Sequence, residues 1–120
     1  MKKKILIVDD DPNIVDYLVT LFEDNGYETC SAGNAQDGFE VAKQEVPDLI
    51  TLDLEMPEEW GPRFYRRLSS DPEIMNTPVI VISGLSGNKY AIQKAVACIS
   101  KPFDRDELLR IVKDAIVDTE

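Results

Sequence analysis

The sequence contains no histidine among its 120 residues. Without an imidazole base, Ser-His-Asp and Cys-His catalytic pairs are excluded, and the chain cannot itself carry a phosphohistidine. Cysteine is scarce as well: Cys30 and Cys98 lie far apart, each in an apolar or strand-like stretch. We interpret both as buried thiols of a protein in the reducing cytoplasm, where disulfides are rare.

Positive charge and long apolar runs are also lacking. The chain has 13 Lys and Arg against 23 Asp and Glu, a formal net charge of -10. An acidic surface repels phosphate backbones, so direct nucleic-acid binding is not expected. The basic start at Lys2–Lys4 is followed only by the short apolar run Ile5–Val8, which ends at aspartates. This pattern predicts neither a signal peptide nor a membrane partner, and the expected location is the cytoplasm.

The apolar segments that are present predict a parallel α/β fold. A chain of 120 residues with 43% apolar residues fits one domain, which we place over residues 1–120. Short apolar runs alternate with amphipathic stretches, which is typical of a parallel sheet covered by helices on both faces. Five helices should alternate with the strands in the flavodoxin-like order 2-1-3-4-5. The expected strands are residues 4–8, 27–31, 49–52, 79–82 and 98–99.

Capping residues predict where three of the helices begin. Asp11 and Asn34 precede the first two amphipathic stretches, and Asp104 precedes the last. Phe103 should pack against Leu108 and fix the entry of the last helix. The buried stripe of the second helix is predicted to contain Ala35, Phe39, Ala42 and Val46.

Polar residues follow four of the five predicted strands. Asp9–Asp11 ends the first strand, Asp53 the third, Ser83 the fourth and Lys101 the fifth. In open α/β sheets, ligands bind at the carboxyl ends of strands, where the strand order reverses. In the order 2-1-3-4-5 this crevice lies between the first and third strands, so Asp9, Asp10 and Asp53 should face one another there.

These residues together supply the parts needed for phosphoryl transfer. Each one alone has an ordinary structural explanation: Asp11 is a helix cap, and Ser83 and Lys101 are typical of turns and loops. Clustered carboxylates repel one another unless a cation or protons neutralise them, and oxygen ligands in a small acidic site suit Mg²⁺. A carboxylate nucleophile, a metal ion, a lysine and a hydroxyl donor then surround one crevice.

The motifs that carry these residues resemble the receiver domain of two-component response regulators, and the likeness spans the whole chain. The matching stretches are Ile7–Asp11, Pro47–Asp53 followed by Met56-Pro57 and Gly61, Pro78–Ser83, and Ser100–Phe103. Receiver domains take a phosphoryl group from a histidine kinase or from a small acyl phosphate. The resemblance therefore implies a phosphoacceptor domain that catalyses only its own phosphorylation and dephosphorylation and is not otherwise an enzyme.

Site roles and partners also come from this resemblance. It implies that Asp53 is the phosphoacceptor and that Ser83 and Lys101 contact the phosphoryl oxygens. The implied Mg²⁺ ligands are Asp9, Asp10, Asp53 and the main-chain carbonyl of Glu55. The implied partners are a histidine kinase or phosphotransfer protein, and a downstream protein or an output domain. A phosphorylation-dependent dimer remains open.

Two departures from the family pattern concern signal output. Cys98 occupies the position where the family usually has the Tyr or Phe that rotates on activation. The interval from Ser83 to Lys101 is roughly four residues short, about one helical turn, so a shortened fourth helix is expected. These departures leave a second interpretation open: a degenerate receiver that binds proteins without regulation by phosphate. A third, a Mg²⁺-dependent phosphatase, would need a further acid or base, for which the sequence offers only Glu58 and Glu59.

Overall fold

The computed structural model describes residues 2–53, 66–68, 70–83, 97–100 and 103–118, and its centre is a parallel β-sheet. The sheet has the order β2-β1-β3-β4-β5. The strands are β1 (Lys4–Val8), β2 (Glu28–Ala32), β3 (Leu49–Leu52), β4 (Val79–Ser83) and β5 (Ala97–Ser100). All four pairings between neighbouring strands are parallel, so their carboxyl ends lie along one edge of the sheet.

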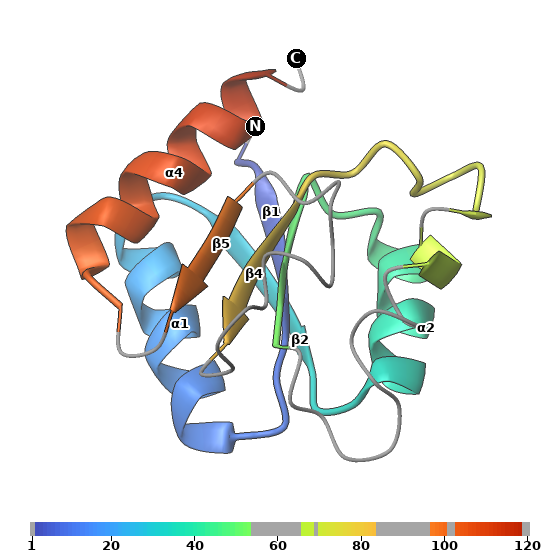
Figure 1. Ribbon diagram of the computed structural model, residues 1–120, viewed down its shortest axis with the longest axis horizontal. Helices are drawn as coiled ribbons and strands as arrows, with labels where there is room; N and C mark the ends of the chain where they lie inside the picture. Colours follow the sequence, from blue (N-terminus) through green and yellow to red (C-terminus); the bar gives the residue numbers. More distant parts are fainter. Residues whose placement is uncertain (1, 54–65, 69, 84–96, 101–102, 119–120) are drawn as a thin grey trace.

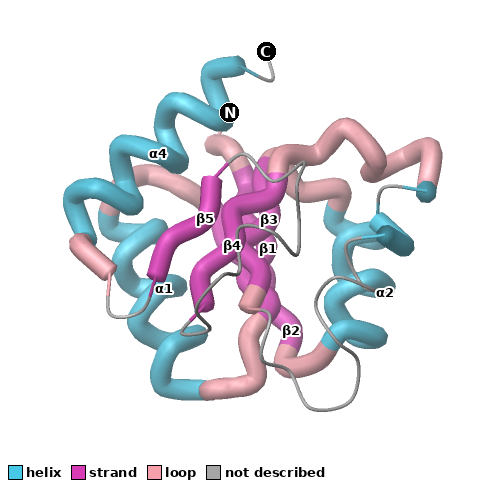
Figure 2. The backbone as a smooth tube through the Cα atoms, viewed as in Figure 1, coloured by secondary structure: helices cyan, strands magenta, loops and turns pink. Residues whose placement is uncertain are grey.

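Helices cover both faces of this sheet (Figure 1, Figure 2). They are α1 (Pro12–Asp24), α2 (Ala35–Glu45) and α4 (Arg105–Asp118). Figure 1 shows α1 and α4 on one side of the strands and α2 on the other. This three-layer arrangement confirms the predicted α/β class. The predicted shortened fourth helix falls in residues 84–96, which lie outside the described residues. None of the described helices has the length and apolar character needed to span a membrane.

The three predicted caps are confirmed. Asp11 accepts a hydrogen bond from the Asn13 N–H at 2.9 Å, and Asn34 accepts one from the Asp37 N–H at 2.8 Å. At the start of α4, Asp104 accepts one from the Asp106 N–H at 2.8 Å. Each bond satisfies a backbone donor that has no partner inside its helix, which fixes where the helix begins.

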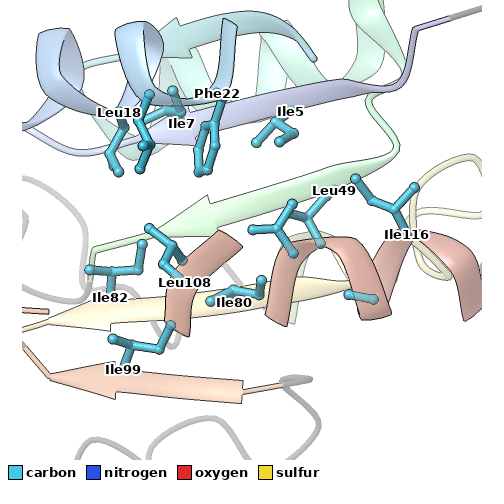
Figure 3. Close-up of a cluster of buried hydrophobic side chains, with 13 residues drawn as sticks. Ile5, Ile7, Leu18, Phe22, Leu49, Ile80, Ile82, Ile99, Leu108 and Ile116 are labelled. Atoms are coloured by element: carbon cyan, nitrogen blue, oxygen red, sulfur yellow. The ribbon is translucent and has the colours of Figure 1, made fainter. Parts of the chain in front are cut away.

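Strand side chains alternate between two apolar clusters. Ile5 and Ile7 point toward α1 and α4, whereas Leu6 and Val8 point toward α2. Figure 3 shows the first of these clusters, where side chains from α1, the strands and α4 meet. Its buried members are Ile5, Ile7, Leu18, Leu21, Phe22, Leu49, Ile80, Ile82, Ile99, Leu108, Val112, Ala115 and Ile116. Because both faces of β1 are buried, its run of apolar residues is continuous rather than alternating.

The predicted buried stripe of α2 was wrong at its last member. Val46 is 55% exposed and forms the C-cap of α2 in the left-handed conformation, with φ 45° and ψ 65°. The next residue is Pro47, whose ring disfavours the helical conformation for the residue before it, so the chain leaves the helix at Val46. Of the other predicted members, Ala42 is buried and Phe39 packs against the cluster on this face.

Three strands differ from their predicted bounds by one residue. The second strand begins at Glu28 and ends at Ala32, the fourth extends to Ser83, and the fifth spans Ala97–Ser100. Ends of this kind depend on pairing between strands, which the local sequence does not show.

Lysines bind acidic side chains at the amino-terminal edge of the sheet. Lys4 binds Glu45 through Nζ at 2.7 Å, and its main-chain N–H donates to Asp48 at 2.8 Å. On the α2 side, Lys43 Nζ lies 2.9 Å from Asp71 and 2.8 Å from Glu73. These contacts join β1 to the end of α2 and to the residue before β3, and they join α2 to the turn that precedes β4.

Candidate functional site

The candidate site lies at the carboxyl edge of the sheet, where β1 and β3 end side by side. Val8 and Leu52 are paired in register, so Asp9 and Asp53 follow the two strands at matching positions. The Asp53 N–H donates to the Val8 carbonyl at 3.0 Å, and the Asp9 N–H donates to the Ala32 carbonyl at 3.2 Å. Both aspartates are therefore held by hydrogen bonds that continue the strand pairing.

Three carboxylates meet at this point. One carboxylate oxygen from each of Asp9, Asp10 and Asp53 lies within 4.8 Å of the other two. Asp9 and Asp53 are only 4% and 3% exposed, whereas Asp10 is open to solvent. The structure thus brings together the three aspartates that the sequence placed in one crevice. The crevice has a buried inner pair of carboxylates and one outer carboxylate.

The main chain holds the Asp9 carboxylate in one orientation. Its Oδ1 accepts a hydrogen bond from the Asp11 N–H at 2.9 Å, while the Asp11 side chain caps α1. The start of α1, which carries a partial positive charge, therefore lies directly beside the acidic cluster in sequence. The sequence predicts Asp11 only as a helix cap. That prediction does not include its main-chain N–H as the donor that positions the Asp9 carboxylate. An Asp followed two residues later by a helix cap was the available signal.

The three carboxylates fit a small divalent cation. Magnesium takes oxygen ligands at about 2.0–2.1 Å, so two of its ligands lie at most about 4.2 Å apart. The described carboxylate oxygens lie within 4.8 Å of one another, so a small closing movement or one intervening water suffices. Two of the three carboxylates are buried, and the repulsion between like charges this close is offset when a cation binds between them.

The remaining predicted site residues are described only in part. Ser83 is the last residue of β4, directly beside β3, and its backbone pairs with Ser100 of β5. The backbone of Cys98 lies in β5. The side chains of Ser83 and Cys98 lie outside the described part of the structure, as do Glu55 and Lys101 entirely. The backbone of Ser83 thus lies at the carboxyl edge of the sheet, the same edge as Asp9 and Asp53.

The decisive comparison is with protein families. The profile described as "Response regulator receiver domain" matches residues 5–113, which includes the whole of every strand of the sheet except Lys4, the first residue of β1. The chain belongs to this family. It is a receiver domain of two-component response regulators, a class of signalling module.

Curated relatives of this receiver domain cover nearly all of it. Protein Rrf1 of Nitratidesulfovibrio vulgaris is 38% identical, and the match covers 97% of this chain and 84% of the relative. Protein PilH of Pseudomonas aeruginosa is 33% identical, over 91% of this chain and 93% of the relative. The polar-differentiation response regulator DivK of Brucella anthropi is 30% identical, over 98% of this chain and 99% of the relative.

Solved structures show the same architecture. The receiver domain of the Francisella response regulator 1452 is 30% identical and superposes with a TM-score of 0.90, covering 99% of this chain and all of that one. A CheY-like receiver domain protein from Methanospirillum hungatei is 27% identical with a TM-score of 0.92, covering 98% and 96%. The sheet and the helices on its two faces are therefore those of the receiver fold.

Proposed function

We propose that this receiver domain, spanning residues 1–120, accepts a phosphoryl group on Asp53 from the phosphohistidine of a histidine kinase or phosphotransfer protein. The observation that carries the proposal is the meeting of Asp9, Asp10 and Asp53 at the carboxyl edge of β1 and β3. Family membership adds that receiver domains typically bind Mg²⁺ at an acidic pocket of this kind. The transfer is not general catalysis, because Asp53 is both the reacting group and the product.

The proposed step moves one phosphoryl group between two side chains. An oxygen of the Asp53 carboxylate attacks phosphorus, the P–N bond of the donor's phosphohistidine breaks, and its electron pair returns to the imidazole. The products are an acyl phosphate on Asp53 and a histidine on the donor. Little covalent chemistry is left for other residues, so positioning and charge neutralisation dominate such transfers.

The residues around Asp53 divide these tasks. Asp9, Asp10, Asp53 and the main-chain carbonyl of Glu55 hold Mg²⁺, which when bound offsets the negative charge of the phosphoryl oxygens. The hydrogen bond from the Asp11 N–H keeps the Asp9 carboxylate turned toward this site. Ser83 and Lys101 contact the phosphoryl oxygens through a hydroxyl and an ammonium group. The position of Ser83 at the end of β4, next to β3, supports its part in this proposal.

Mass spectrometry of the intact protein tests the proposal. After treatment with acetyl phosphate and Mg²⁺, the wild type should gain one phosphoryl group, and Asp53→Ala should gain none. A wild type that gains none would instead support the degenerate receiver that binds proteins without phosphate. Continuous turnover of the donor without a stable adduct would support a phosphatase.

Binding of the metal has its own measurement. Trp60 is the only tryptophan of the chain and follows Asp53 by seven positions. We expect millimolar Mg²⁺ to change its fluorescence, and Asp10→Asn to shift that response to higher metal concentrations because one carboxylate ligand is lost. Wild-type fluorescence that does not change on addition of Mg²⁺ would contradict the proposed metal site.

A further inference from the structure

A second feature of the surface lies away from the carboxylate cluster, on the face covered by α2. A groove with a volume of about 440 Å³ runs between α2 and the helical residues that follow position 65. Figure 2 shows that short helical segment beside α2. The described residues that line the groove are Phe39, Arg66, Arg67, Ser70, Asp71 and Pro72. Neither the proposed phosphotransfer nor the family comparison gives this groove a role.

The floor of the groove combines an aromatic ring with an arginine. The Arg67 guanidinium carbon lies over the Phe39 ring, 4.7 Å from its centre. Stacking of this kind uses the face of the guanidinium, and its N–H donors point outward in the plane of the group. Phe39 and Pro72 add apolar surface on either side. The groove therefore combines apolar surface with positive charge.

The acidic residue in the lining is already matched by a lysine. The Asp71 carboxylate lies 2.9 Å from Lys43 Nζ, and it also accepts a hydrogen bond from the Glu73 N–H. The hydrogen bond from Lys43 and the bond from the Glu73 N–H lower the pKa of the Asp71 carboxyl, so it is ionised and paired in the folded protein. Arg66 makes no ion pair with any residue that the structure describes. Its charge is therefore available in a chain whose net charge is -10.

We propose that this groove is a docking site for a short acidic peptide segment of a partner protein. A carboxylate accepts two parallel hydrogen bonds from a guanidinium, and Arg66 offers such a pair at the rim. An apolar side chain of the same segment packs on Phe39 and Pro72. The inference goes beyond phosphotransfer and does not depend on it.

Two observations favour a peptide over other anionic ligands. The net charge of -10 opposes long polyanions such as nucleic acid, whereas a segment with one or two carboxylates is repelled far less. Small-molecule sites bury most of their ligand, but Arg66, Arg67, Ser70 and Pro72 are all exposed. An open groove with donors along its rim suits an extended chain.

Fluorescence anisotropy with a designed probe tests the docking site. The probe is a fluorescein-labelled short peptide of alternating glutamate and leucine, and its partner is the same peptide with glutamine in place of each glutamate. The acidic peptide should bind the wild type more tightly, and Arg66→Gln should weaken its binding by about five-fold, as expected for one exposed bidentate pair. The backbone amide signals of Phe39 and Ser70 should shift when the peptide is added.

Arg110→Gln is the matched control, because it removes the same charge from an exposed position on α4. Equal weakening by both arginine variants would show general charge attraction and overturn the proposal. So would equal binding of the acidic and glutamine peptides, or the absence of saturable binding. A nucleotide that displaces the acidic peptide and binds more tightly would overturn the choice of a peptide ligand.

Discussion

The two ends of the β-sheet use acidic residues in opposite ways. At the amino edge, Glu45, Asp71 and Glu73 each lie within 2.9 Å of a lysine nitrogen. At the carboxyl edge, Asp9 and Asp53 gather with a third aspartate within 4.8 Å, and both are almost fully buried. The residue type is the same, but at one end the carboxylates contact lysine nitrogens and at the other they gather with one another.

This difference separates stability from function. A carboxylate beside a lysine favours the folded state modestly, whereas carboxylates beside one another oppose it until a ligand with positive charge binds. Proteins retain a group of residues that destabilises the fold where activity depends on that group. We therefore propose that the carboxyl edge with Asp9, Asp10 and Asp53 (the crowded end) is the functional end, and that the amino edge with the lysine pairs (the matched end) serves the fold.

The sharpest test of this comparison makes one substitution at each end. Asp53→Ala should abolish the gain of a phosphoryl group from acetyl phosphate, because the accepting oxygen is lost. Asp71→Ala should keep that gain and instead lower the melting temperature, because the carboxylate that binds Lys43 is lost. Intact mass and thermal unfolding of both variants give the two readouts. If Asp71→Ala also blocked phosphorylation, the two ends would not be separable.

A milder change at the crowded end should raise stability. Asp10→Asn removes one of the three charges while keeping the shape of the side chain. Two like charges about 5 Å apart repel by about 1 kcal/mol in water and about 3 kcal/mol at an effective dielectric of 20. Since Asp10 is exposed, we expect a gain of about 1 kcal/mol in the free energy of unfolding without metal. Urea unfolding measures this gain.

The same variant should respond less to Mg²⁺. A metal that binds only the folded protein stabilises it in proportion to its affinity, and Asp10→Asn removes a ligand. The wild type should therefore gain more stability than the variant on addition of Mg²⁺. Equal gains for the two proteins would show that Asp10 does not bind the metal.

At the opposite end, backbone strain at Val46 gives a further contrast. Its left-handed conformation, with φ 45°, is unfavourable for a β-branched residue, and its side chain is largely exposed. Val46→Gly should raise the free energy of unfolding by about 1 kcal/mol, because relief of strain exceeds the added chain entropy of glycine. Val46→Ala keeps Cβ and should change stability less. A loss of stability in the glycine variant would contradict strain at this position.

Much of this organisation could be predicted from the sequence, because its signals are local. Apolar runs predicted the strands, and Asp11, Asn34 and Asp104 predicted the helix starts through bonds to residues two or three positions away. The cluster of Asp9 and Asp53 followed from a general rule about where parallel strands end. That rule needs only the strand order and the residue after each strand.

What the sequence could not predict depends on contacts between distant segments. Val46 continues the apolar periodicity of α2, so the pattern predicts that it is buried. Only the effect of Pro47 on the preceding residue indicates that the helix ends there. The bond between the Asp11 N–H and Asp9 depends on how the chain turns after β1. The sequence also does not predict that Lys43 binds Asp71 and Glu73, because 28 and 30 positions separate it from these two residues. The groove beside Phe39 is equally unpredictable, because it forms between distant segments.

The smallest expected effect concerns the pH dependence of the matched end. The hydrogen bond from Lys43 and the adjacent Glu73 N–H lower the pKa of Asp71 below its ordinary value of 3.8. The contribution of this carboxylate to stability is therefore present above pH 3.8 and is lost as the pH falls through the lowered value. The hydrogen bonds to Glu73 and Asp71 raise the pKa of Lys43 above 10.5. Its contribution is present below pH 10.5 and is lost as the pH rises through the raised value.

Lys43→Met should remove this dependence while keeping the apolar stem of the side chain. Its melting temperature should lie below that of the wild type at neutral pH, and the gap should close at both extremes. High salt should narrow the gap at neutral pH, since the pair is partly exposed. Lys113→Met on α4 removes the same charge from an exposed position and should leave the pH profile unchanged. A constant gap across the whole pH range would show that Lys43 stabilises the fold through packing, and the two ends of the sheet would then differ less than their charges imply.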